Sequence, residues 1–138
     1  MAKSQSLLSK AVMVEKEVTT GTATGTLTGP AVGAGTLVLA AGVELVGTVG
    51  TASTSHVIKV TDGSTDFMAD TDINSAAAGT FAFGTQTQAV IAANDTIDAT
   101  QTIVGTGQTA ATARIWAIVV DVNEATRGAA EVDRDQLA

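Results

Sequence analysis

Apolar and polar residues alternate along much of this chain, the period expected of β-strands that bury one face. The alternation is clearest in residues 11–18, where Val12, Val14 and Val18 share one face. Met13 lies on the opposite face together with two glutamates. This segment is therefore predicted to be a half-buried strand.

Further apolar segments are separated by Gly, Asn and Asp, which favour turns. The strongest turn signal is Asp62-Gly63. Gly42 is expected to separate two strands, and residues 19–35 are expected to form a long Thr/Gly-rich loop around one short strand. The predicted strands are residues 24–28, 36–41, 43–49, 55–61, 66–69, 80–83, 89–93, 96–102 and 112–122.

The segment 112–122 is the most apolar of these strands, and both of its faces carry large side chains. Ile115 and Val119 lie on one face, and Trp116 and Ile118 lie on the other. A strand that is apolar on both faces is either central in a sandwich or buried against another subunit. A tryptophan on a central strand is more often part of the core than a sugar-stacking residue.

Many short strands separated by turns, without a convincing helix pattern, predict an all-β fold. We expect a single β-sandwich or jelly-roll-like barrel over residues 11–122. A flexible N-terminal arm, residues 1–10, precedes it, and a flexible polar C-terminal tail, residues 123–138, follows it. One small sandwich has only one core, so the outward side chains Met13, Trp116 and Ile118 are predicted to contact other copies. A trimer is favoured over a dimer.

The composition of the chain argues against several classes of function. The formal net charge is −7 and no basic stripe is present, which argues against nucleic-acid binding. The chain has three Phe, one Trp and no Tyr, too few rings for an ordinary ligand pocket. Cysteine is absent, which excludes thiolate metal sites. No signal-peptide core and no membrane-spanning stretch is visible, so we expect no membrane partner and synthesis in a cytoplasm.

The sequence contains no recognisable catalytic motif. His56 is the only histidine, and serines and threonines flank it, but no nucleophile elbow accompanies it. We expect His56 to face solvent or a neighbouring subunit on its strand. The protein is therefore predicted to have no enzymatic activity and no cofactor.

The acidic segment after the Asp62-Gly63 turn is the best candidate for a metal site, because carboxylates at alternate positions suit a hard cation such as Ca²⁺. An EF-hand loop is excluded, since its sixth and twelfth positions would be Ser and Phe. A looser Ca²⁺ site stays open, against the reading of a solvated loop with Asx turns. We predict no bound metal. The candidate ligands are Asp62, Asp66, Asp70, Asp72 and Asn74.

Two segments, residues 60–80 and 94–122, resemble a family of small virion proteins encoded near the major capsid protein of tailed phages. These are head decoration, or cement, proteins. The chain departs from the family pattern in having Phe81 and Phe83 without the Tyr that often precedes the D-T-I strand. The shared features are Asp62-Gly63, Asp66-Phe67, the Ala/Gly segment 76–79, the DTIDAT strand 95–100, the Gly/Thr loop 105–109 and the Val-rich strand 118–122.

The resemblance implies a structural protein that binds the outer surface of the phage head and stabilises the lattice of the major capsid protein. It implies location on the virion after synthesis in the host cytoplasm. A glycan-binding host-recognition module of a fibre or tail tip is the alternative. The polar ends of the chain are the expected capsid contacts, through Lys3, Leu7, Leu8, Lys10, Arg127, Arg134 and Leu137.

Overall fold

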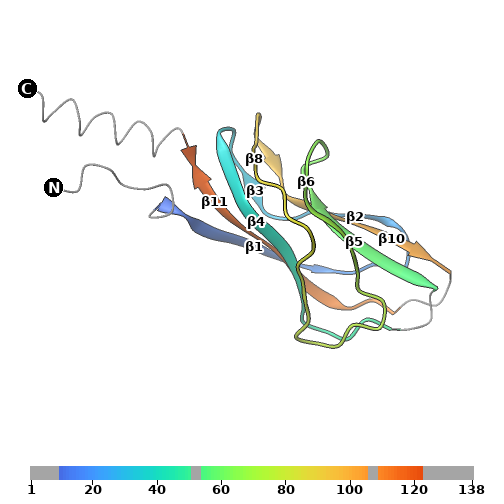
Figure 1. Ribbon diagram of the computed structural model, residues 1–138. Coiled ribbons are helices and arrows are strands. Elements are labelled where there is room, and N and C mark those ends of the chain that lie inside the picture. Colours follow the sequence, from blue (N-terminus) through green and yellow to red (C-terminus); the bar gives the residue numbers. More distant parts are fainter. Residues whose placement is uncertain (1–9, 51–53, 106–108, 123–138) are drawn as a thin grey trace, which may run out of the picture.

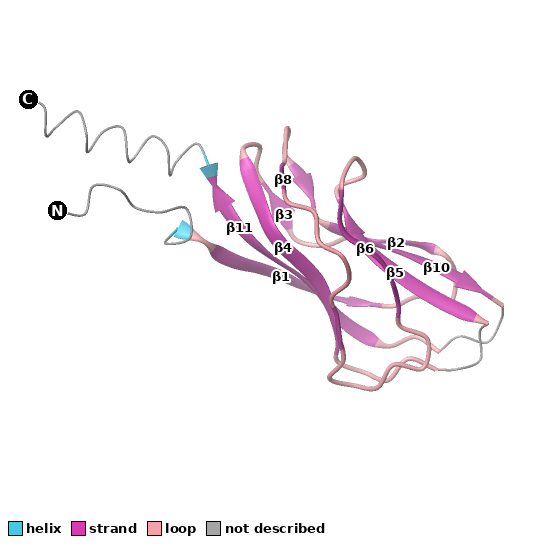
Figure 2. Ribbon diagram, in the orientation of Figure 1, coloured by secondary structure: helices cyan, strands magenta, loops and turns pink. Residues whose placement is uncertain are grey.

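Two antiparallel β-sheets face each other and enclose the core, as the computed structural model shows (Figures 1 and 2). It describes residues 10–50, 54–105 and 109–122. The predicted all-β sandwich is confirmed. The strands are β1 (Val12–Thr19), β2 (Gly25–Leu27), β3 (Ala31–Val32), β4 (Thr36–Leu45), β5 (Ser55–Thr61), β6 (Asp66–Asp72), β7 (Phe81–Ala82), β8 (Ala89–Val90), β9 (Asp95–Thr96), β10 (Asp98–Val104) and β11 (Thr112–Asp121).

The larger sheet has the strand order β1-β11-β4-β7, and β8 also pairs with β4. The second sheet has the order β2-β10-β5-β6, and β3 pairs with β9 in a short ribbon. The strand from residue 112 is central, as its two apolar faces predicted. Its partner β1 comes from the other end of the chain, with Val12 opposite Val119. The beginning of β1 and the end of β11 therefore lie at the same end of the sandwich (Figure 1).

Alternation of exposure along the strands builds the core. On β11, Ala113, Ile115 and Ala117 are fully buried, while the residues between them are partly exposed. On β5, Ile58 and Val60 are fully buried in the same way. Successive side chains of a strand point to opposite faces of its sheet, so these residues fill the space between the sheets.

Gly42 does not separate two strands, contrary to the sequence prediction. β4 runs from Thr36 through Gly42 to Leu45 without interruption. Gly42 lies directly opposite Trp116 on β11, and a Cβ at this position would lie 2.7 Å from the ring carbon Cζ2 of Trp116. The missing side chain therefore makes room for the indole, and this glycine serves packing and not a turn.

Two other segments differ from the prediction because of pairing between distant parts of the chain. The expected loop 19–35 contains β3, which pairs with β9, in addition to the expected short strand. The expected strand 96–102 is divided at Ile97, whose side chain is buried and whose N–H donates to the carbonyl of Pro30. The strand expected at 43–49 ends at Leu45.

The two faces of β11 allow a test of the core. Ile115→Ala is expected to lower the free energy of unfolding by about 2–4 kcal/mol, because it removes fully buried methyl groups. Ile118→Ala is the matched control on the outer face, where the side chain is partly exposed, and its loss is expected to be smaller. Denaturant unfolding measures both values, and equal losses would contradict the assignment of the faces.

Candidate functional site

The outer face of the larger sheet carries an open apolar groove. Its volume is about 290 Å³, at the lower end of the range of roughly 300–1,000 Å³ typical of small-molecule pockets. An open groove of this size suits the docking of a few side chains better than the enclosure of a ligand. The lining residues are Met13, Glu15, Glu44, Phe81, Trp116 and Ile118.

Strand register explains why these residues meet. Met13 on β1 lies opposite Ile118 on β11, and Glu44 on β4 lies opposite Phe81 on β7. All of them project from the face that points away from the core. The three predicted contacts with other copies, Met13, Trp116 and Ile118, are thus brought together in one groove. Their role in self-association stays a prediction.

Trp116 forms the floor of this region. Its ring lies over Gly42 and stacks on Phe83, with ring centroids 5.7 Å apart and an interplanar angle of 9°. Trp116 is therefore a partly exposed residue of the outer face, and the expectation of a core tryptophan is wrong. Its Nε1–H is buried and has no hydrogen-bond partner among the described residues.

Aromatic and acidic side chains surround the groove. Phe81 and Phe83 are 60% and 53% exposed, so two large apolar rings stand in solvent beside Trp116. Glu15 and Glu44 supply carboxylates at the rim. Arg114 Nη1 lies 3.3 Å from Glu44 Oε2 and offsets one of these charges. The rim is therefore acidic around an apolar floor.

The sequence prediction missed Glu15, Glu44, Phe81 and Phe83 as parts of this surface. Phe81 was placed on a strand, but the pattern around it showed neither which strand would be its neighbour nor which face it would share. The available signal was the parity of Met13 and Glu15 on their strand. It showed that the two side chains share a face, but not that β11 and β4 continue that face.

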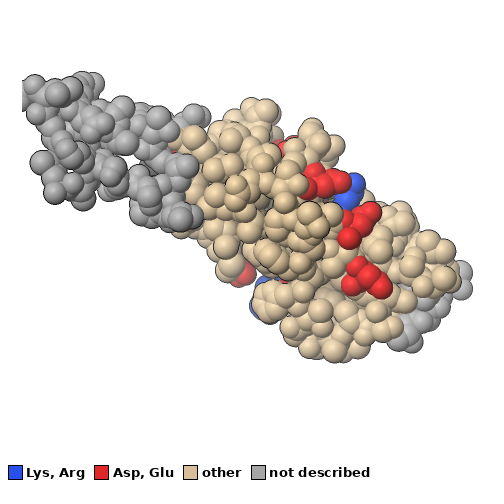
Figure 3. Space-filling view, in the orientation of Figure 1, with Lys and Arg blue, Asp and Glu red and all other residues tan. Residues whose placement is uncertain are grey.

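The candidate metal ligands do not converge. Four of them belong to or follow the strand β6, which spans Asp66–Asp72, although a strand was expected only over residues 66–69. Because a strand rises about 3.3 Å per residue, its first and last carboxylates are widely separated. In the space-filling view, acidic side chains gather along the β5–β6 side of the molecule (Figure 3). Within the described ranges, no three acidic or histidine side chains are grouped so as to hold a metal ion.

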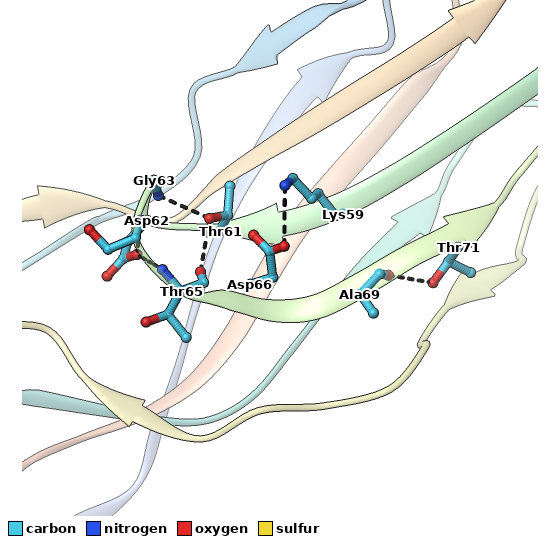
Figure 4. A network of polar contacts seen from close by, with 9 residues as sticks. Lys59, Thr61, Asp62, Gly63, Thr65, Asp66, Ala69 and Thr71 are labelled. Atoms are coloured by element: carbon cyan, nitrogen blue, oxygen red, sulfur yellow. Dashed lines mark hydrogen bonds and ion pairs between the residues drawn. The ribbon is translucent and has the colours of Figure 1, made fainter.

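Several of these carboxylates have structural partners instead. Asp62 accepts hydrogen bonds from the backbone N–H of Ser64 and of Thr65 at 2.8 and 2.7 Å, which closes the turn before β6 (Figure 4). Gly63 in this turn has φ +91°, so the predicted tight turn is confirmed. Asp66 pairs with Lys59 at 3.2 Å.

The last two candidate ligands form an Asx turn, in which Asp72 accepts from the N–H of Asn74 at 2.9 Å. Asp70 is exposed on β6. These partners account for the acidic segment as a hydrogen-bonded edge of the sandwich.

His56 is fully buried, so the expectation that it faces solvent or a subunit neighbour is wrong. Its Nε2 lies 3.0 Å from Oε1 of Gln101, and Gln101 Nε2 donates to the carbonyl of Ala23. Because the carbonyl of Ala23 orients the amide of Gln101, Nε2–H of His56 is the donor, and the neutral ring is in its Nε2-protonated tautomer. Nδ1 has no hydrogen-bond partner in the part of the chain that the structure describes.

Burial lowers the pKa of His56 below its ordinary value of 6.5, and the hydrogen bond to Gln101 and the charge of Asp72 partly oppose this shift. A proton on Nδ1 would place a charge in the core without a partner. His56 therefore serves packing in its neutral form, and its position inside the sandwich keeps it from a substrate.

Lys10 is exposed directly before β1. The other expected capsid contacts lie outside the described residues: Lys3, Leu7, Leu8, Arg127, Arg134 and Leu137. The described parts of the chain contain no helix that is long and apolar enough to span a membrane.

No family model and no curated protein matches the sequence. Among solved structures, the chain is similar to one in the cyanophage Pam1 capsid asymmetric unit, with a TM-score of 0.60 and 16% identity over 80% of this chain and 84% of that one. A chain of the acidic stable capsid structure of Helicobacter pylori bacteriophage KHP30 gives a TM-score of 0.48 and 15% identity, covering 80% and 96%. The likeness to the Pam1 chain shows a shared fold.

The buried histidine predicts a pH dependence of stability. Its folded-state pKa lies below the unfolded value of about 6.5, so the unfolded chain takes up the proton first as the pH falls. The contribution is therefore complete above about pH 6.5 and is lost as the pH falls toward the lower folded pKa. His56→Gln should flatten this part of the profile in urea unfolding measured between about pH 7.5 and 5.5, and equal slopes would contradict the assignment.

Chelation tests the metal prediction. A chelator is expected to leave the melting temperature unchanged, because the carboxylates of the acidic segment are dispersed or already hydrogen-bonded. A cation bound only by the folded state would raise stability by mass action. A fall in melting temperature that excess Ca²⁺ reverses would show that a site exists.

Proposed function

We propose that this protein is a non-enzymatic structural component of a bacteriophage virion that binds the outside of the head and stabilises the lattice of the major capsid protein. The single observation that carries the proposal is the shared fold with a chain of the Pam1 capsid asymmetric unit, which extends over most of both chains. The sequence resemblance to decoration proteins points to the same role independently.

Surface chemistry supports a place outside the shell. Residues 11–122 carry ten carboxylates against three basic side chains. Such a surface is repelled by the phosphates of packaged nucleic acid. The same charge limits non-specific association before assembly.

The ends of the chain supply the contacts to the shell in this proposal. Both flank the same end of the sandwich, because the start of β1 pairs with the end of β11. Two segments that leave the sandwich at the same end can contact neighbouring capsid subunits on both sides of the point where the sandwich is attached. The contacts are those expected from the sequence: Lys3, Leu7, Leu8, Lys10, Arg127, Arg134 and Leu137.

Self-association belongs to the proposal through the grooved face. Met13 is 59% exposed, and it lies with Trp116 and Ile118 in an apolar surface that another copy would cover. A two-fold contact through this face would bring the two acidic rims together, which costs free energy. A trimer built from unlike surfaces avoids this repulsion and is favoured over a dimer.

One observation favours a second function, the recognition of host glycans. Three of the four aromatic rings, those of Phe81, Phe83 and Trp116, gather on one face, and sugar rings stack on such surfaces. Reproducible hits on a glycan array that disappear in Phe83→Ala would promote this function over capsid binding.

Co-sedimentation with virions tests the main proposal. We expect the protein to sediment with intact heads in a stoichiometry comparable to that of the shell protein. Arg127→Ala/Arg134→Ala is expected to lower the occupancy of undecorated heads, because it removes the cations of the tail. Asp133→Asn/Asp135→Asn is the matched control and should retain occupancy. Absence of the wild-type protein from purified virions would overturn the proposal.

A further inference from the structure

We propose that, in the free protein, the groove on the outer face of the larger sheet is the docking site for residues 1–10 of the same chain. The side chains of Leu7 and Leu8 would fill the apolar floor, and the lysines would lie at the acidic rim. The contact is intramolecular, and it requires neither a capsid nor a second copy.

The exposed apolar surface is the reason to look for an occupant. Met13, Phe81 and Phe83 are each more than half exposed, and they lie on one face with Trp116 and Ile118. Covering such a patch removes apolar surface from water, which is favourable in proportion to the area covered. Contiguous apolar patches on soluble proteins mark interaction sites.

The first ten residues are within reach. Leu8 is four residues from Val12, where β1 begins, so their Cα atoms are at most about 14 Å apart. Lys10 has a helical backbone conformation two residues before Val12, the first residue of β1. A short helical segment precedes β1 (Figure 2). Met13, at the next position of the strand, already lines the groove. A short tether gives an effective concentration on the order of millimolar.

Charge favours residues 1–10 over residues 123–138 as the occupant of the groove. Residues 1–10 contain two lysines and no carboxylate, whereas residues 123–138 contain four carboxylates and two arginines. The rim contributed by Glu15 and Glu44 attracts the first segment and repels the second. Both segments start from the same end of the sandwich, so reach does not discriminate between them and charge does.

The apolar side chains of residues 1–10 favour the same occupant of the groove as the charge does. Leu7 and Leu8 are two adjacent large aliphatic side chains, and a pair of this size fits an open groove of about 290 Å³.

One consequence rests on the proposed function, whereas the docking itself does not. If the first ten residues leave the groove to contact a capsid, the apolar face is uncovered and becomes available to a neighbouring copy. Capsid binding and self-association are then coupled through one segment that can occupy only one site at a time.

Fluorescence of the full-length protein tests the docking, because Trp116 is the single tryptophan and the chain has no tyrosine. Relative to wild type, Leu7→Ser/Leu8→Ser is expected to shift the Trp116 emission to longer wavelength and to raise the acrylamide quenching constant. Lys3→Glu/Lys10→Glu should act in the same direction through the acidic rim. Ser4→Ala/Ser6→Ala is the matched control in the same segment and should leave both readouts unchanged.

Unchanged emission and quenching in the leucine variant would overturn the proposal. The difference between wild type and this variant is expected to persist on dilution, with light scattering reporting no change in mass. A difference that vanishes on dilution would instead assign the segment to a neighbouring copy and would overturn the intramolecular contact. Because no head is present, failure here is distinguishable from failure of capsid binding.

Discussion

The pairing of β11 with β1 on one side and β4 on the other is the contact on which the rest of the structure depends. It joins strands from the two ends of the chain, with Val12 opposite Val119 and Leu45 opposite Ala113. This pairing places β11 inside the larger sheet and its inner face against the core, and it brings the start of β1 and the end of β11 to the same end of the sandwich. The outer face of β11 forms the floor of the groove.

The core contains few aromatic rings, and most aromatic residues of the chain lie on the outer face of the larger sheet. Among the buried residues, Phe67 is the large aromatic side chain of the interior, and the remaining volume is filled mainly by Ala, Val and Ile. Trp116 lies instead over Gly42 on the outer face and stacks on Phe83. Small inner residues allow the sheets to approach closely, whereas the rings on the outside form an exposed apolar surface.

The buried polar side chains of the described residues include one pair that is joined directly. His56 and Gln101 come from neighbouring strands of the smaller sheet and are joined by a hydrogen bond inside the sandwich. The carboxylates of the acidic segment lie on and beside β6, where Asp62 and Asp72 accept hydrogen bonds in turns and Asp66 pairs with Lys59. Among the described residues, the carboxylate, lysine and arginine side chains therefore all lie outside the core.

The alternation of residues by itself determined the all-β class, most strand positions and the outward side of Met13, because a period of two is a local property of the chain. The Asp62-Gly63 turn followed from an equally local signal, the Asp-Gly dipeptide. The tertiary structure decided the role of Gly42, the burial of His56 and the meeting of Met13, Phe81 and Trp116. Each depends on which strand lies beside which. Such neighbours are set by pairing between residues far apart in sequence, which local pattern does not encode.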